Sequence, residues 1–337
     1  ITEPTDASSF GCMDLRTNRW SEKIVQASGI DGSKLPDIMP STQVAGYVTR
    51  EAANATGLRA GTPVVLGGGD GVCANVGAGS VRPGKAYCSL GSSSWVATTS
   101  EQPVLDDRMR TMCWPHIVPG YYSPNGTMQT GGGAYSWLKN TVCKWETQAA
   151  DELRISPYEL INREIEASDP GANGLLFLPY LLGERAPRWN PLARAAFLGV
   201  KMENTRGDLL RSVLEGVTLN LELIFDILSK QTKIDELLLI GGGAKGRVWA
   251  QIIADVFGVR TMIPKVLEEA TSMGAAVTGG VGVGLFKDFG VIDRMIEVVG
   301  SFEPSHENRD IYERSIRLFE KAYTALEDFY CEMAGKD

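Results

Sequence analysis

The most restrictive feature of the sequence is a repeated local pattern, in which an apolar run ends in a corner of glycines, or of one glycine followed by serines. Three such corners follow strand-like runs, at 67–71, 91–94 and 241–246, and a fourth at 131–133 opens a helix-like segment. Glycine lets a ligand approach the backbone closely, and exposed N–H groups in such a turn can hold phosphate oxygens. A single corner is most often only a tight turn. Four corners in a chain of alternating strands and helices predict a layered α/β fold with a nucleotide site.

Local patterns in the first part of the chain predict mainly strands. Residues 43–49 are typical of a strand, and residues 50–57 of a short helix that ends at a glycine. Residues 61–69 predict a buried strand that runs into the first glycine corner, and residues 85–99 predict two strands joined at the second. Asn125–Gly126 is a common turn sequence, so we expect a turn there between strand-like flanks.

The second part of the chain predicts longer helices. Residues 130–142 pass from glycines into a helix, and residues 174–191 predict a strand followed by a polar loop. Residues 234–258 predict a strand, a glycine turn and a helix, and residues 308–335 a final amphipathic helix. A further helix begins at Thr205, which fits a capping box with Asp208. The apolar face of that helix is formed by Leu210, Val213, Leu214, Val217 and Leu221.

Composition excludes several classes of protein. The 337 residues are enough for two ordinary domains, and 43% of them are hydrophobic. The net charge of −8 argues against nucleic acid as the main partner. We find no apolar run long enough for a membrane helix. Six scattered cysteines form no CxxC pair, so we expect reduced thiols and a cytoplasmic location rather than a zinc site. With only two histidines, His116 and His306, a Ser–His–Asp enzyme is disfavoured.

One glycine corner also matches a dinucleotide-binding motif. Gly241, Gly243 and Gly246 satisfy GxGxxG, which raises a dehydrogenase as an alternative. That fold needs an acidic residue at the end of the next strand, where it binds a ribose. The corresponding segment, 259–266, contains no acidic residue, so the pattern disfavours dinucleotide binding.

Longer stretches resemble the FGGY family of carbohydrate kinases, which includes xylulokinase, gluconokinase and glycerol kinase. The second signature of that family is matched by Ala195, Phe197, Gly199, Val200, Asp208, Leu209, Ser212, Val213, Leu214 and Glu215. The stretches "GGGDG", "SLGSSSW", "LFLPYLLGERAPRWNP" and "GGGAKGRVWAQIIADVFG" resemble the family's other blocks, in the same order. The resemblance covers nearly the whole chain. Much of the signature resembles fold-maintaining positions, so we do not expect Ser212 or Glu215 to be catalytic.

The resemblance implies two actin-like domains of the ribonuclease H-like ATPase fold, with ATP and sugar in the cleft between them. The chain resembles the end of the first domain and all of the second. Residues 1–80 are expected to be a remnant of the N-terminal kinase domain, and residues 81–337 the complete C-terminal kinase domain. Since most of the first domain would then be missing, we expect the chain alone to self-associate and to be inactive.

The resemblance also implies the roles of individual residues. Asp70 corresponds to the catalytic base, which accepts the proton of a sugar hydroxyl as that oxygen attacks the γ-phosphorus of ATP. Its bare glycine loop would let both substrates approach. Mg²⁺ would accompany ATP, and Asp70 would reach it through water, with no further metal ligand expected in the chain. The residues implied in phosphate binding are Gly91, Ser92, Ser93, Gly132 and Gly133.

The last glycine corner resembles the family's adenosine turn. Gly242, Gly243 and Ala244 would leave a flat slot for the base because they lack bulky side chains. Arg247 falls where relatives contact adenine. Trp249 is expected to pack in the core rather than to form a shelf for adenine.

The function expected from the resemblance is an ATP-dependent sugar kinase that transfers the γ-phosphoryl group to a hydroxyl of a ketose or polyol. Xylulose is the favoured acceptor. Gluconate or another polyol is the alternative, because Gly71 stands where several xylulokinases carry Asn, whereas Ser92 in place of the commoner Thr keeps the hydroxyl. A non-catalytic actin-like ATP-binding module is the alternative from another class, but it would not need Asp70. The expected partners are sugar and ATP, and we expect neither nucleic acid nor a membrane as a partner. A homodimer is a possible oligomeric state.

Overall fold

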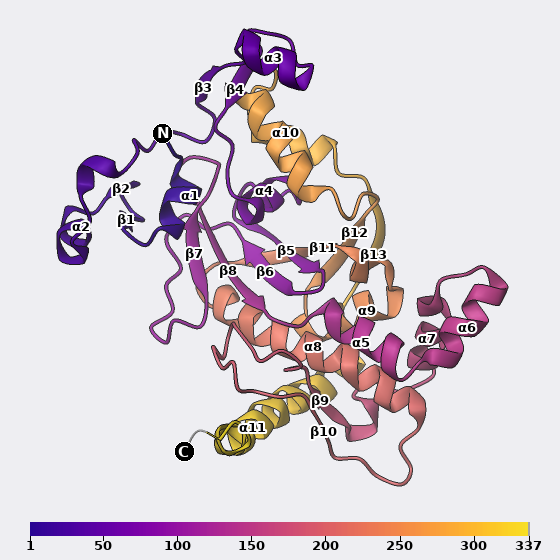
Figure 1. Ribbon diagram of the computed structural model, residues 1–337. Coiled ribbons are helices and arrows are strands. Elements are labelled where there is room, and N and C mark those ends of the chain that lie inside the picture. The colour runs from indigo at the N-terminus through magenta and orange to yellow at the C-terminus, as the bar shows by residue number, and fades with distance from the viewer. Residues whose placement is uncertain (336–337) are drawn as a thin grey trace.

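The computed structural model describes residues 1–335, and a seven-stranded mixed sheet lies at its centre (Figure 1). The strand order is β13-β12-β11-β5-β6-β8-β7. β11 is parallel to β12 and β5, and the other neighbouring pairs of this sheet are antiparallel. The strands are β5 (Gly84–Leu90), β6 (Ser94–Thr98), β7 (Met112–Pro115), β8 (Tyr122–Met128), β11 (Ile234–Ile240), β12 (Arg260–Pro264) and β13 (Val298–Phe302).

Helices cover both faces of this sheet (Figure 1). One face packs against α4 (Asp70–Gly77) and α10 (Ala270–Gly282), and the other against α5 (Gly132–Thr141), α8 (Arg206–Ser229) and α9 (Arg247–Phe257). The side chains of β5 show why both faces are buried. Cys88 and Leu90 belong to the apolar cluster under α8 and α9, whereas Tyr87 belongs to a cluster with residues of α4. Successive side chains of a strand point to opposite faces, so this strand reads as a nearly continuous apolar run.

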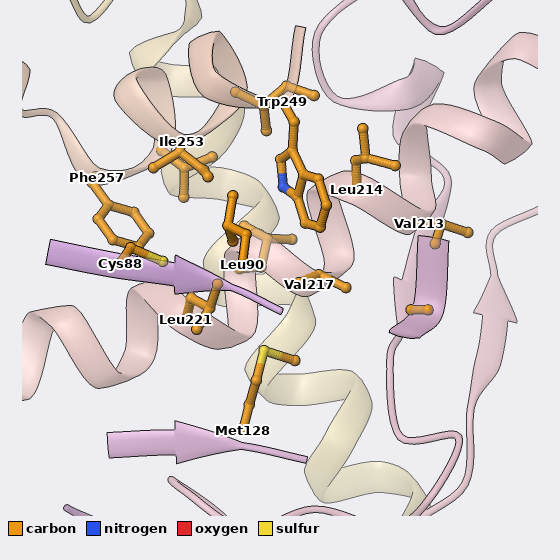
Figure 2. Close-up of a cluster of buried hydrophobic side chains, with 14 of the residues drawn as sticks. Cys88, Leu90, Met128, Val213, Leu214, Val217, Leu221, Trp249, Ile253 and Phe257 are labelled. Carbon is orange, nitrogen blue, oxygen red and sulfur yellow. The ribbon is translucent and has the colours of Figure 1, made fainter. Parts of the chain in front are cut away.

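The larger core forms between the sheet, α8 and α9, as Figure 2 shows. The capping box predicted at Thr205 is present, since its side chain accepts the Asp208 N–H and the Asp208 side chain accepts the Thr205 N–H. The predicted apolar face of α8 is fully buried, and α9 adds Trp249, Ile253 and Phe257 opposite to it. The expectation that Trp249 packs in the core is confirmed. Its Nε1 donates to Thr218 Oγ1 at 3.0 Å.

The strand order brings two glycine corners to one edge of the sheet. β5 and β11 are parallel, with Ser89 opposite Ile240, and each strand ends one residue before a glycine. A Cβ atom at Gly241 would lie 3.0 Å from the carbonyl carbon of Leu90, so the two corners are in direct contact. Ligands of open α/β sheets bind at the carboxyl ends of such strands.

The contact between α4 and α10 depends on glycines. A Cβ atom at Gly77 of α4 would lie 1.7 Å from the carbonyl oxygen of Ala270. A Cβ atom at Gly274 of α10 would lie 1.8 Å from the carbonyl oxygen of Cys73. Any larger residue at either position would force the helices apart, and α4 is the helix that begins with Asp70.

The turn predicted at Asn125–Gly126 is wrong. Both residues lie inside β8, which pairs without interruption with β6 on one side and with β7 on the other. Glycine is required there for packing, since a Cβ atom at Gly126 would lie 2.6 Å from Cγ2 of Ile224. Tertiary packing of the strand against α8 therefore overrides the local turn preference.

The strand predicted before the first glycine corner exists, but it is not buried. β4 (Pro63–Val65) pairs only with β3 (Val44–Tyr47), and Val64 is 46% exposed. This small sheet lies at the periphery of the molecule beside α10 (Figure 1). The end of α10 packs on it, since a Cβ atom at Gly282 would lie 2.8 Å from Cγ1 of Val65. The predicted helix is α3 (Arg50–Thr56), and Gly57 ends it in the left-handed conformation, as expected.

The remaining elements surround these layers. The N-terminal ones are α1 (Pro4–Ser9), β1 (Met13–Asp14), β2 (Arg19–Trp20) and α2 (Glu22–Ser28). Those of the second part are α6 (Lys144–Leu153), α7 (Pro157–Glu166), β9 (Leu176–Leu178), β10 (Ala196–Leu198) and α11 (Arg309–Met333), the predicted final helix. Among the described residues, every helix is too short or too polar to cross a membrane.

Candidate active site

Asp70 is the first residue of α4 rather than a residue in the middle of a loop. Its carboxylate is exposed, and Oδ1 accepts the N–H of Gly71 at 2.7 Å. The preceding loop is held by Thr5, whose hydroxyl accepts the Gly69 N–H at 3.0 Å. Gly67 has a φ of +81°, a conformation that favours glycine. The glycines thus let the chain turn sharply into α4 and present the carboxylate to the outside.

A cavity of about 240 Å³ opens beside this carboxylate, and we call it the Asp70 cavity. Besides Asp70 and Ser93, its wall includes Tyr87, Trp95, Trp114, Asn125, Arg185 and Thr271. Except for Asp70 and Ser93, these residues were not predicted to belong to a site. The pairing of β5, β6, β7 and β8 brings Tyr87, Trp95, Trp114 and Asn125 together. Arg185 reaches the cavity from the loop between β9 and β10, and Thr271 from α10.

Two aromatic contacts fix the wall near Asp70. Trp95 Nε1 donates to the Tyr87 hydroxyl at 2.9 Å, and that hydroxyl donates to the carbonyl of Gly71 at 3.0 Å. Burial raises the pKa of Tyr87, which keeps the hydroxyl protonated for this contact. Trp114 covers Gly71 closely, because a Cβ atom at residue 71 would lie 3.0 Å from Cζ3 of its ring. The indole thus occupies space that an Asn side chain at residue 71 would need.

A second, larger cavity of about 920 Å³ lies at the corner after β11, and we call it the Gly242 cavity. Its wall contains several of the expected residues, namely Gly91, Ser92, Gly132, Gly242 and Gly243. It also contains Tyr135, Tyr158 and Asn162, which the sequence analysis missed. The rings of Tyr135 and Tyr158 are 4.7 Å apart, and the Tyr135 hydroxyl donates to Asn162 Oδ1 at 2.6 Å. An aromatic and amide wall of this kind suits a flat heterocycle.

Free backbone donors occur at the two corners beside the cavities. The N–H groups of Ser92, Ser93, Gly242 and Gly243 meet no acceptor within residues 1–335. Backbone donors that carry no protein acceptor and face a cavity can bind phosphate oxygens. Ser92 borders the Gly242 cavity and Ser93 the Asp70 cavity, so the Gly91–Ser93 turn stands between them.

Gly132 and Gly133, which the resemblance places in contact with ATP, have N–H groups that already carry acceptors. The N–H of Gly132 donates to the Gly91 carbonyl at 2.8 Å, and that of Gly133 to the Ser92 carbonyl at 3.0 Å. A Cβ atom at Gly132 would lie 2.6 Å from the carbonyl oxygen of Gly91. These glycines therefore allow the start of α5 to pack against the turn, and their contact with ATP stays a prediction.

The residues of the predicted adenosine turn differ in their surroundings. A Cβ atom at Gly243 would point into the core, 2.8 Å from Leu90 Cβ and 2.9 Å from Trp249 Cζ3, whereas one at Gly242 would meet nothing within 4 Å. Ala244 is buried and lies outside the cavity wall. Arg247 is exposed, and its guanidinium lies 5.2 Å from the centre of the Phe302 ring, away from the wall. Of the glycines in this turn, Gly242 is the one whose added Cβ would meet open space, and the adenosine contact stays a prediction.

Comparison with known proteins identifies the relationship. The C-terminal domain model of the FGGY family of carbohydrate kinases matches residues 86–283, and the N-terminal domain model matches residues 1–77. The chain belongs to the FGGY family. The predicted family is therefore confirmed. The proposed boundary at residue 80 falls between the two matched ranges and stays a prediction.

Relatives within the FGGY family carry different names. A gluconokinase from Bacillus licheniformis is 31% identical over 331 residues, which are 98% of this chain and 64% of the relative. A xylulose kinase from Staphylococcus epidermidis is 34% identical over 323 residues, which are 95% of this chain and 63% of the relative. The chain thus spans slightly less than two thirds of the length of these curated relatives.

Solved structures of FGGY kinases share the fold. A ligand-bound xylulose kinase from Lactobacillus acidophilus superposes with a TM-score of 0.89 at 25% identity, over 98% of this chain and 66% of that one. A gluconate kinase from the same organism also gives a TM-score of 0.89 at 25% identity, over 98% of this chain and 65% of that one. The expected actin-like α/β fold is confirmed. The names of these relatives differ in the sugar, so they do not identify the phosphoryl acceptor of this chain.

Proposed function

We propose that the site transfers the γ-phosphoryl group of ATP to a hydroxyl of a small sugar or polyol. One observation carries the proposal: the Gly91–Ser93 turn separates the Gly242 cavity from the Asp70 cavity and contributes to both walls. A nucleotide whose base lies in the larger cavity and whose phosphates cross this turn would end beside Asp70. Phosphoryl transfer depends mainly on such positioning and on stabilisation of charge.

The proposed roles follow from the hydrogen-bond donors, acceptors and space that each residue leaves free. The N–H groups of Ser92 and Ser93 bind the β- and γ-phosphates, since they have no acceptor within residues 1–335. The exposed carboxylate of Asp70 accepts the proton of the acceptor hydroxyl. Gly242 leaves room for adenosine beside Tyr135.

Mg²⁺ belongs to the proposal because it accompanies ATP in phosphoryl transfer, where it neutralises phosphate charge. Within residues 1–335 no group of three or more His, Cys, Asp or Glu side chains could hold a metal ion. That fits Mg²⁺, which commonly takes one or two carboxylates and completes its shell with phosphate oxygens and water. Asp70 is the residue that would contact it, through water.

The acceptor is proposed as a ketose or polyol, with xylulose favoured by the sequence and gluconate as the alternative. Relatives with both names are about equally similar to the chain. The absence of an amide at Gly71, whose place Trp114 covers, weakens the case for xylulose. A cytoplasmic location stays a prediction from cysteine usage, and a homodimer also stays a prediction.

We also propose that the 337-residue chain on its own binds adenine nucleotide weakly, self-associates and phosphorylates no sugar. In the family fold both domains set the in-line geometry, and the chain spans 64% of the length of a related gluconokinase. An ADP-release assay over xylulose, ribulose, gluconate and glycerol checks this proposal. Sugar-dependent turnover of about 1–100 s⁻¹ would contradict it.

The phosphoryl-transfer proposal is tested with Asp70→Asn in a full-length protein that carries this chain and the rest of the family's length. The variant should lower kcat by about 10²–10⁴ and leave ADP affinity unchanged, because the carboxylate does not hold the nucleotide. Asp151→Asn is the matched control, since Asp151 is exposed on α6 and borders neither cavity. Turnover near the wild-type value would remove Asp70 as the base. Nucleotide binding without any sugar-dependent turnover in the unmodified protein would favour the ATP-binding module instead.

A further inference from the structure

Arg185 is the one cation in the wall of the Asp70 cavity among residues 1–335. The same wall holds a single carboxylate, Asp70, and otherwise neutral side chains. A reaction in which phosphate oxygens enter this cavity brings several negative charges next to one another. The structure offers them one positively charged side chain.

The backbone around Arg185 is fixed on both sides. Its N–H donates to the Glu184 carboxylate at 2.8 Å, and its carbonyl accepts the N–H groups of Arg188 and Trp189 at 2.7 and 2.6 Å. The next residue is tied to β8, because its N–H donates to the Thr127 carbonyl at 3.1 Å. The side chain of Arg185 therefore leaves an immobilised backbone and enters the cavity beside β8.

The Glu184 carboxylate is itself a buried anchor for this segment. It is 4% exposed and also accepts the N–H of Gln129 and the Asn220 side-chain amide, the latter at 3.0 Å. These donors come from the end of β8 and from α8. The anchor thus connects the position of Arg185 to the sheet and to the helix beneath it.

The guanidinium of Arg185 makes no hydrogen bond or ion pair within residues 1–335. Its neighbour Arg188 differs, since it pairs with Glu320 and lies 4.1 Å from the centre of the Tyr323 ring. The nearby Arg194 donates to the carbonyls of Pro191 and Ala193. Arg185 is exposed, so its backbone is fixed while its unpartnered guanidinium keeps all of its donors available to an anion.

We propose that Arg185 is a further catalytic residue, which binds the oxygens of the γ-phosphoryl group while that group moves to the acceptor. This inference rests on the proposed function. As the acceptor oxygen attacks phosphorus, its proton passes to Asp70, the new O–P bond forms, and the bond to the β-phosphate oxygen breaks with its electron pair left on ADP. Arg185 stays protonated throughout and neutralises charge on the transferred oxygens.

The same guanidinium could instead bind a carboxylate of a sugar-acid acceptor, and the two sources of anion give different results. Calorimetry on a full-length protein that carries this chain and the rest of the family's length compares ADP with ADP plus Mg²⁺ and aluminium fluoride, a mimic of the transferred group. The variants are Arg185→Gln, Arg185→Lys and, as a matched control from the same segment, Arg194→Gln. A parallel titration compares gluconate with its neutral alcohol, glucitol.

We expect the unmodified protein to bind the fluoride complex more tightly than ADP alone. Arg185→Gln should reduce that preference by about 10- to 100-fold without changing ADP affinity, as loss of a hydrogen bond to a charged group predicts. Arg185→Lys should restore part of the preference, and Arg194→Gln should keep all of it.

An intact preference in Arg185→Gln, or no preference in the unmodified protein, would overturn the inference. A loss confined to gluconate binding would overturn it as well and assign Arg185 to the acceptor. A full-length protein that binds no ADP at all would refute the proposed function, and this inference with it.

Discussion

Substitution of the neighbouring glycines 242 and 243 should have opposite consequences, although both belong to one glycine corner. A Cβ atom at Gly243 would lie 2.8 Å from Leu90 Cβ and 2.9 Å from Trp249 Cζ3. Neither neighbour can move easily: Leu90 Cβ is attached to the backbone of β5, and Trp249 is held by its hydrogen bond to Thr218. Overpacking of such a core lowers the free energy of unfolding by about 1–3 kcal/mol, and Gly243→Ala should fall in that range.

Gly242→Val should leave the fold intact and weaken nucleotide binding. Its Cβ would meet nothing within 4 Å and would project towards the Gly242 cavity. The free energy of unfolding should change by less than about 0.5 kcal/mol, as for most exposed substitutions. The branched side chain would occupy space required by adenosine, and we expect ADP affinity to fall by about tenfold or more, which corresponds to about 1.4 kcal/mol.

Urea denaturation of both variants and ADP calorimetry on the folded protein separate the two effects. The reasoning fails if Gly243→Ala unfolds at the same urea concentration as the unmodified chain. It fails equally if Gly242→Val is folded and binds ADP with unchanged affinity, because the base would then lie elsewhere.

Two further predictions concern stability. Gly274→Ala should lower the free energy of unfolding by at least about 1–3 kcal/mol, because its Cβ would lie 1.8 Å from the Cys73 carbonyl oxygen. Gly279→Ala on the same helix should leave the free energy of unfolding unchanged, because its Cβ would meet nothing within 4 Å, and urea denaturation of the two variants compares them. Desolvation by burial raises the pKa of Glu184 to about 7 from an ordinary 4.5, so the folded chain retains a proton that the unfolded chain loses between these values. The stability that this group contributes is therefore fully present below pH 4.5 and declines by on the order of 3 kcal/mol as the pH rises towards 7. Urea denaturation at about pH 5 and about pH 7.5 should show a smaller decline for Glu184→Gln than for the unmodified chain. An equal decline in both proteins would contradict the raised pKa of Glu184.

Local patterns predicted the elements whose geometry is set by their own residues. The β5–β6 hairpin and the strand–turn–helix unit from Ile234 to Phe257 form as expected, because apolar runs and glycines are decisive over short distances. The capping box at Thr205 was predictable for the same reason, since both partners lie within one turn of helix. The position of Asp70 at the end of a glycine run also followed from the sequence.

The features that were missed depend on neighbours far away in the chain. The sequence around Gly126 is typical of a turn, but the residue is a glycine because it packs against Ile224. Gly243 was predicted to line a slot for the base, but an added Cβ there would point at Leu90. Arg185 gave no signal of its own, because its unpaired state is defined only by the arrangement of β8, α8 and the loop between β9 and β10. Sequence patterns show which residues can make a site, and packing decides which of them face it.

The turn Gly91–Ser93 forms part of the wall of both cavities, so it has a thermodynamic consequence for their ligands. A nucleotide that shifts or rigidifies this turn changes the shape offered to the acceptor on its other side. The two binding equilibria are then linked by one coupling free energy, and linkage makes that coupling reciprocal. The factor by which a nucleotide alters acceptor affinity must equal the factor by which the acceptor alters nucleotide affinity. Under the proposed function, any coupling between nucleotide and acceptor that passes through this turn would therefore act equally in both directions.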